Sequence, residues 1–175
     1  MKHNLFDLFQ NRFPADRSEP FIETGDSRVY TYAEAEQASS RFARLLGDRG
    51  VQPGDRLAVQ VDKSPEAVFL HLASLRLGAV YLPLNTAYRD AEMTHFFTDA
   101  EPKALICRPE DEAERGALAR ASDVSCVLTL NGGGEGTLIA ESRGLDADYP
   151  TAETDADDIA ALLYTSGTTG RPKGA

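Results

Sequence analysis

Short apolar runs alternate with helical patterns through the middle of the chain. Each run has the length and the apolar content of a buried strand, and the segments between the runs carry apolar residues at helical spacing. The expected strands are Arg56–Val61, Ala79–Leu82, Ala104–Cys107 and Val124–Leu130. Strands joined by helices through short connections are parallel, with right-handed crossovers. The pattern therefore predicts an α/β fold, in which a mostly parallel sheet is flanked by helices on both faces.

The helix expected after the first of these strands has clear start and stop signals. Ser64 precedes Pro65 and Glu66, which gives an N-cap, a proline at the first helical position and an acidic first turn. Gly78 marks its end. Residues 65–77 are apolar almost all round, which is typical of a helix buried between layers. The other two helices are expected at residues 90–99, capped by Asp90, and at 111–121.

Before the sheet, the pattern predicts a helix, a hairpin and a second helix. The first two are an amphipathic helix at residues 4–12, with Leu5, Leu8 and Phe9 on one side, and a hairpin of residues 21–24 and 28–30. Thr31 and Glu34 have the spacing of a capping box, and the helix that they begin is expected to end at Gly50.

Residues 131–158 carry weaker signals. A glycine-rich loop follows Asn131, and Leu138 and Ile139 suggest only a short helix. The segment 146–158 is acidic, so a carboxylate metal site is conceivable there. A solvated connector is the favoured interpretation, because the segment offers no third ligand and no apolar shielding.

Composition and charge exclude several classes of function. The 175 residues suit about one domain, and 42% apolar with 26% charged residues is typical of a globular chain. A net charge of -10 disfavours partners such as nucleic acid and anionic membranes. No apolar run approaches the ~20 residues of a membrane span, and the N-terminus lacks the apolar core of a signal peptide.

The cysteines are interpreted as structural residues, and the histidines as structural or surface residues. Cys107 and Cys126 lie in apolar, strand-like segments and are expected to pack as small hydrophobic side chains, which suits a cytoplasmic protein. His3, His71 and His95 have no second ligand at metal-binding spacing.

The stretch from Tyr164 to Gly174 carries the strongest chemical signal. An apolar segment, Ile159–Leu163, is expected to form a strand, and it is followed by hydroxyl-bearing residues, two glycines and a lysine. Gly167 and Gly170 permit a backbone nest of N–H groups, and Lys173 supplies a cation for phosphate. The alternative interpretation is a surface turn that binds no ligand. A Walker A loop does not fit, because Pro172 stands where that motif requires a glycine.

The order of residues in this stretch resembles the phosphate-binding signature of the acyl-adenylate-forming superfamily. A second block, Gly78–Tyr88 followed by Phe97–Lys103, resembles the acyl-CoA synthetases and is most similar to their malonyl-CoA synthetase subgroup. The resemblance extends along essentially the whole chain and is loosest between residues 103 and 155.

This resemblance implies a two-step reaction. A carboxylate, malonate or another small acid, reacts with ATP in the presence of Mg²⁺ to give acyl-AMP and pyrophosphate, and CoA then displaces AMP. The implied phosphate-binding residues are Thr165, Ser166, Gly167, Thr168, Thr169, Gly170 and Lys173. A fatty or aryl carboxylate is the alternative substrate.

Family members continue for several hundred residues beyond this point. Residues 1–175 are therefore expected to be a partial AMP-binding N-terminal domain that ends just after the phosphate-binding loop, before its returning strand. The C-terminal domain and the catalytic residues are expected to be absent, and the isolated chain inactive. A non-catalytic nucleotide-binding or interaction module, or a gene remnant, is the other hypothesis.

Overall fold

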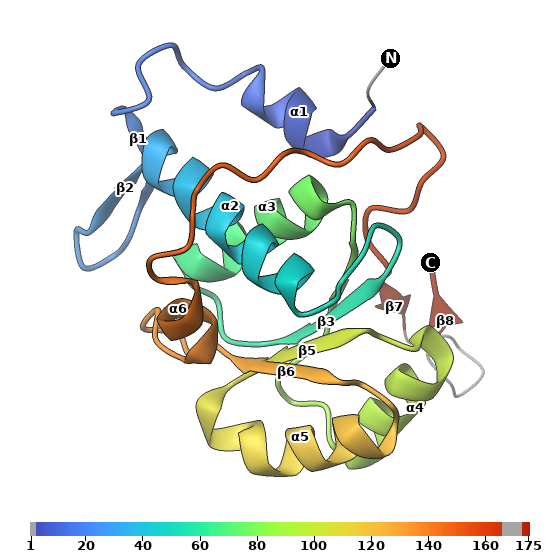
Figure 1. Ribbon diagram of the computed structural model, residues 1–175. Coiled ribbons are helices and arrows are strands. Elements are labelled where there is room, and N and C mark those ends of the chain that lie inside the picture. Colours follow the sequence, from blue (N-terminus) through green and yellow to red (C-terminus); the bar gives the residue numbers. More distant parts are fainter. Residues whose placement is uncertain (1–2, 166–172) are drawn as a thin grey trace.

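The centre of the fold is a four-stranded parallel sheet. The computed structural model describes residues 3–165 and 173–175 (Figure 1). The strands are β3 (Arg56–Gln60), β4 (Val80–Pro83), β5 (Ala104–Cys107) and β6 (Cys126–Thr129). They lie in the order β4-β3-β5-β6, and each neighbouring pair is parallel. The predicted α/β sheet and its four strands are confirmed, with β6 shorter than the apolar run that predicts it.

Helices cover both faces of this sheet, also as predicted (Figure 1). The helices α2 (Tyr32–Asp48) and α3 (Pro65–Leu77) share one apolar core with Leu57, Val59 and Ile106. The helices α4 (Asp90–Ala100) and α5 (Glu112–Ala121) share a second core with Ala58 and Leu105 on the opposite face. The units β3-α3-β4 and β5-α5-β6 run in opposite directions along the sheet and cross opposite faces. Their crossovers therefore have the same hand.

The ends of α3 follow the signals in its sequence, whereas the start of α4 does not. The Ser64 hydroxyl accepts a hydrogen bond from the Ala67 backbone N–H at 3.1 Å, and Gly78 closes the helix in the left-handed conformation with φ of 74°. The prediction that Asp90 caps α4 is wrong. Arg89 is the N-cap, and Asp90 is the first helical residue, whose carboxylate pairs with Arg115 instead.

Helix α1 (Leu5–Gln10) forms, but its apolar side is not the one that the spacing predicts. Phe6 is fully buried, with the Arg76 guanidinium 4.0 Å from its ring centre. Leu5, Leu8 and Phe9 are 40%, 52% and 44% exposed. The cation–π contact and the core beneath Phe6 therefore fix the rotation of this short helix, rather than the larger apolar stripe.

The hairpin and the helix after it are as expected. Strands β1 (Pro20–Glu23) and β2 (Val29–Thr31) are antiparallel. Thr31 and Glu34 form both hydrogen bonds of the capping box that begins α2. The helix ends at Asp48, two residues before Gly50, which has a φ of 86°.

The acidic segment 146–158 is more than a solvated connector. Its aspartates and Glu153 are exposed, but its backbone is hydrogen-bonded to both the side chain and the carbonyl of Arg76 in α3. The Arg76 guanidinium donates to the Tyr149 carbonyl at 2.9 Å, and the Ala152 N–H donates to the Arg76 carbonyl at 2.8 Å. The Asn4 side chain also donates to the Ala152 carbonyl. The segment is thus a strap across α3 that also fixes the N-terminal residues.

The glycine-rich loop ends in a close backbone contact beside α6 (Thr137–Ser142), the short helix expected there. Elsewhere, a 3₁₀ turn (Pro109–Asp111) directly precedes α5. The Thr129 N–H donates to the Thr137 hydroxyl at 2.8 Å, and the Thr137 N–H donates to the Thr129 hydroxyl at 2.9 Å. This reciprocal pair draws Gly136 against Thr129, where a Cβ on Gly136 would lie 2.2 Å from the Thr129 carbonyl oxygen.

We expect Gly136→Ala to lower the free energy of unfolding by about 1–3 kcal/mol, because an added Cβ meets backbone atoms and φ is 139°. Gly25→Ala is the matched control, since a Cβ at Gly25 meets no atom within 4 Å. Urea unfolding of both variants measures the difference. Equal stabilities for the two variants would contradict this account of the loop.

Two predictions for the end of the chain are wrong. Ile159–Leu163 is not a strand. It contacts the sheet through a single parallel bridge, Ala161 with Tyr81, and Ile159 and Leu163 remain 62% and 53% exposed. The returning strand that was expected to be absent is present as β8 (Lys173–Gly174), antiparallel to β7 (Tyr164–Thr165). In the part of the chain that the structure describes, no helix is long and apolar enough to cross a membrane.

Candidate functional site

The candidate phosphate site is built on the β7-β8 pair. Tyr164 is opposite Gly174, and Thr165 is opposite Lys173. Two hydrogen bonds of 2.9 Å between Leu163 and Ala175 continue the pairing. The predicted site residues Ser166, Gly167, Thr168, Thr169 and Gly170 lie outside the described residues. The structure thus brings the first and last predicted ligands, Thr165 and Lys173, together across the pair.

The two faces of this pair differ in character. Cross-strand partners present their side chains on the same face, and successive residues alternate between faces. Thr165 and Lys173 therefore share one face, on which both residues are exposed. Within the described ranges, no carboxylate forms an ion pair with Lys173. A threonine hydroxyl and a free ammonium on one face are suited to bind phosphate oxygens.

The other face carries Tyr164, which contacts α4. Its ring centre lies 4.7 Å from that of Phe96 and 6.0 Å from that of His95, and its hydroxyl donates to the Asp99 carboxylate. Burial, and then the bond to Asp99, raise the pKa of the Tyr164 hydroxyl. The hydroxyl therefore stays protonated and can donate this hydrogen bond throughout the neutral range. The sequence does not reveal this contact, although Asp99 and Tyr164 both lie in the recognised blocks.

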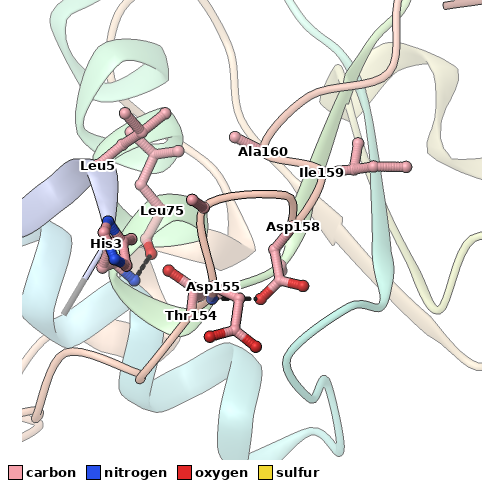
Figure 2. A pocket seen from close by; sticks show the side chains of 12 residues that line it. His3, Leu5, Leu75, Thr154, Asp155, Asp158, Ile159 and Ala160 are labelled. Carbon is pink, nitrogen blue, oxygen red and sulfur yellow. Dashed lines mark hydrogen bonds between the residues drawn. The ribbon is translucent and has the colours of Figure 1, made fainter. Parts of the chain in front are cut away.

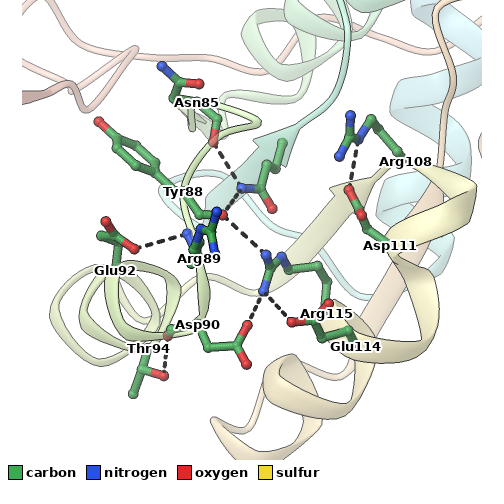
Figure 3. A network of polar contacts seen from close by, with 11 residues as sticks. Asn85, Tyr88, Arg89, Asp90, Glu92, Thr94, Arg108, Asp111, Glu114 and Arg115 are labelled. Carbon is green, nitrogen blue, oxygen red and sulfur yellow. Dashed lines mark hydrogen bonds and ion pairs between the residues drawn. The ribbon is translucent and has the colours of Figure 1, made fainter.

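A polar network at the carboxyl end of the sheet fixes the loop that leads into α4 (Figure 3). The side-chain amide of Gln60, which is fully buried, donates to the carbonyls of Asn85 and Tyr88 at 2.9 and 3.1 Å. Arg115 donates to the same Tyr88 carbonyl at 3.1 Å and pairs with Asp90. The hydrogen bond to Arg115, more than any other contact, lowers the pKa of Asp90. Gln60 at the end of β3 and Arg115 in α5 thus both fix the loop before α4 through hydrogen bonds.

A hollow of about 140 Å³ lies between α1, the end of α3 and the strap (Figure 2). Within it, the Asn4 side chain donates to the Leu75 carbonyl at 2.8 Å, and the Asp155 N–H donates to Asp158. Pockets for small molecules usually exceed about 300 Å³. The hollow is too small for a nucleotide, and neither Thr165 nor Lys173 lines it.

The cysteines have no catalytic geometry. Both are free and buried, and burial raises the pKa of Cys107 to about 12 and also raises that of Cys126. Neither thiol is therefore a nucleophile near neutral pH, and their predicted packing as hydrophobic side chains is confirmed. Burial likewise lowers the pKa of His71, which lies edge-on against Tyr81.

The described residues do not supply a site for Mg²⁺. Across residues 3–165 and 173–175, no three histidine, cysteine or carboxylate side chains are grouped closely enough to hold a metal ion. The dispersed carboxylates of the strap do not fit such an ion.

Comparisons with known proteins agree with this architecture. A family model described as AMP-binding enzyme matches residues 7–175. The apo and ATP-bound crystal structures of MatB from Rhodopseudomonas palustris match all of this chain with a TM-score of 0.94, at 43% and 44% identity. The long-chain-fatty-acid–CoA ligase FadD13 of Mycobacterium tuberculosis is 30% identical over 174 residues, which are 99% of this chain. The chain spans 34% of MatB and 34% of FadD13.

Proposed function

The chain belongs to the AMP-binding enzyme family, and from this premise we propose that it is the N-terminal part of an ATP-dependent acyl-CoA synthetase. The observation that carries the proposal is the pairing of Thr165 with Lys173, which flank the predicted phosphate-binding loop. This arrangement supports a site for the phosphates of ATP. All 175 residues of the chain match part of ATP-bound MatB, which is consistent with such a site.

In the proposed reaction, a carboxylate attacks the α-phosphorus of ATP to give acyl-AMP and pyrophosphate, and CoA then displaces AMP. Both partners of the first step are anions, so the site must neutralise negative charge as they approach. Lys173 supplies a positive charge to the β- and γ-phosphates, and Thr165 donates a hydroxyl hydrogen bond beside it. The loop residues Ser166, Gly167, Thr168, Thr169 and Gly170 complete this phosphate site in the proposal. Mg²⁺ is the cofactor that the resemblance implies, and its ligands are not among the described residues.

Malonate, or another small carboxylate, is the proposed substrate. Two findings support it: the resemblance of the two sequence blocks to the malonyl-CoA synthetase subgroup, and the higher identity with MatB than with FadD13. A fatty carboxylate is the competing substrate, because FadD13 is a long-chain-fatty-acid–CoA ligase. We place the protein in the cytoplasm, in keeping with two buried thiols that form no disulfide.

As a domain, residues 1–175 are proposed to form part of the AMP-binding N-terminal domain, with the acyl pocket and a C-terminal catalytic domain supplied by further sequence. The share of MatB that the chain spans, 34%, supports this division. The 175 residues alone are then expected to form no acyl-CoA.

One observation favours a second candidate, a nucleotide-binding module without catalysis. The β7-β8 pair closes within the 175 residues, so Thr165 and Lys173 are already in place. Calorimetry distinguishes the two candidates. Micromolar binding of Mg-ATP by the 175-residue chain favours the module.

Substrate-dependent exchange of labelled pyrophosphate into ATP tests the proposed function. The complete polypeptide that carries this sequence is assayed with Mg²⁺ and, in turn, malonate, a long-chain fatty acid and benzoate. We expect exchange with malonate, and its loss when the metal is removed with EDTA. Exchange with the fatty acid or benzoate alone would overturn the substrate, and no exchange with any acid would overturn the enzyme class.

A further inference from the structure

The β7-β8 pair needs an external support to hold its orientation. Each strand has two residues, and an isolated two-stranded hairpin is marginally stable in water. The chain before it touches the sheet at one bridge, Ala161 with Tyr81. Leu162 and Tyr164 pack against the core that lies between the sheet and α4.

Tyr164 fixes the orientation of β7 relative to α4. Its ring is tilted by 53° against Phe96, and Phe96 in turn contacts Tyr88 at 5.0 Å between ring centres. These apolar contacts allow the ring to slide, whereas its hydrogen bond to Asp99 fixes the hydroxyl end. The bond joins residues that are 65 positions apart in the sequence.

The helix that carries Asp99 is itself held in place. Gln60 and Arg115 fix the Tyr88 carbonyl, and the Glu92 carboxylate accepts a hydrogen bond from the Arg89 N–H at 2.9 Å (Figure 3). Met93, Phe96 and Phe97 are buried in the same core, between the sheet and α4. Asp99 is therefore a fixed point against which β7 can be oriented.

The position of Tyr164 determines the direction of its neighbours. Because successive side chains of a strand point to opposite faces, anchoring Tyr164 on α4 turns Thr165 away from α4. Lys173 faces the same way as its partner Thr165. A rotation of β7 would move both side chains together.

We propose that Asp99 and Tyr164 form a positioning pair, which orients Thr165 and Lys173 toward the phosphates of ATP. The inference rests on the proposed function and deepens it. Neither residue contacts the nucleotide. Their role is to reduce the number of orientations that the phosphate-binding face adopts before ATP arrives, which lowers the entropic cost of binding.

Kinetics of three variants of the complete polypeptide test the pair. Tyr164→Phe keeps the ring and removes the hydroxyl, and Asp99→Ala removes the acceptor. Each is expected to raise the KM for ATP about tenfold in pyrophosphate exchange, with the KM for the carboxylate unchanged. Asp99→Asn keeps an oxygen that can accept from the hydroxyl, so it should restore most of the affinity for ATP.

A double-mutant cycle separates a positioning role from a structural one. If the two residues act as a pair, Tyr164→Phe combined with Asp99→Ala has little more effect than either change alone. Glu101→Gln is the matched control, because it removes the neighbouring exposed carboxylate, whose partner is Arg56 at 3.9 Å. It should leave the KM for ATP unchanged.

Each other outcome has a separate meaning. Three outcomes would overturn the positioning pair. The first is an unchanged KM for ATP in Tyr164→Phe, and the second is additive effects in the double variant. The third is a rise in the KM for ATP that occurs only in variants whose Tm has also fallen. An unmodified polypeptide with no exchange for any acid would instead overturn the proposed function.

Discussion

Replacement of Lys173 by alanine is expected to lower carboxylate-dependent pyrophosphate exchange by about 100-fold, in line with the loss of one group that stabilises developing charge. The side chain is exposed and shares a face with Thr165, so its ammonium is available to phosphate and contributes little to the core. The Tm of the variant should stay within about 1 °C of the parent, because exposed substitutions away from special features change stability little.

The effect of Lys173→Ala should be specific to its position. Lys63 is also exposed, in the loop between β3 and α3, so Lys63→Ala changes the net charge by the same amount and should retain full exchange activity. Lys173→Arg should recover only part of the rate, because a planar guanidinium cannot place its charge at the same point as an ammonium. An equal loss of activity in the Lys63 variant, or an unimpaired Lys173→Ala, would remove Lys173 from the phosphate site.

The sequence is informative where the signal is local. The strands of the sheet are short apolar runs, and α3 begins with Ser64-Pro65 and ends at Gly78, so neighbouring residues alone specify them. The phosphate loop is recognisable for the same reason. Its hydroxyls, glycines and lysine are contiguous in the chain.

The failures are those that depend on tertiary contacts. Helix α1 presents Phe6 to the core because Arg76, 70 positions away, covers its ring. Ile159–Leu163 is apolar enough for a strand, but only Ala161 forms a bridge to the edge of β4. The strap follows α3 because its backbone pairs with Arg76, which its acidic composition does not reveal.

The same limit applies to the site. Thr165 and Lys173 are identified as candidates by their residue types, but the cross-strand pairing that joins them appears only in the structure. In the sequence, nothing distinguishes Asp99 from other carboxylates at helix ends, because its contact with Tyr164 depends on how α4 packs against the sheet.

Truncation of Leu72 to alanine is expected to have the largest effect on stability, a loss of about 2–5 kcal/mol in the free energy of unfolding. Leu72 lies in α3 and is 5% exposed, within the core that α2, α3 and the sheet share. Removing its branched end takes away buried apolar contacts and leaves a cavity, which close packing on both sides of α3 prevents from collapsing.

Val68 offers a control one turn earlier on the same helix. It is 41% exposed, so Val68→Ala should cost less than about 1 kcal/mol. Native-state hydrogen exchange of the amides of α3 and β3 in the complete polypeptide measures both variants where the change acts, even if other domains unfold separately. Faster exchange in Leu72→Ala than in Val68→Ala confirms that α3 is the packed centre of this face. Equal rates would mean that the core on this side does not depend on Leu72.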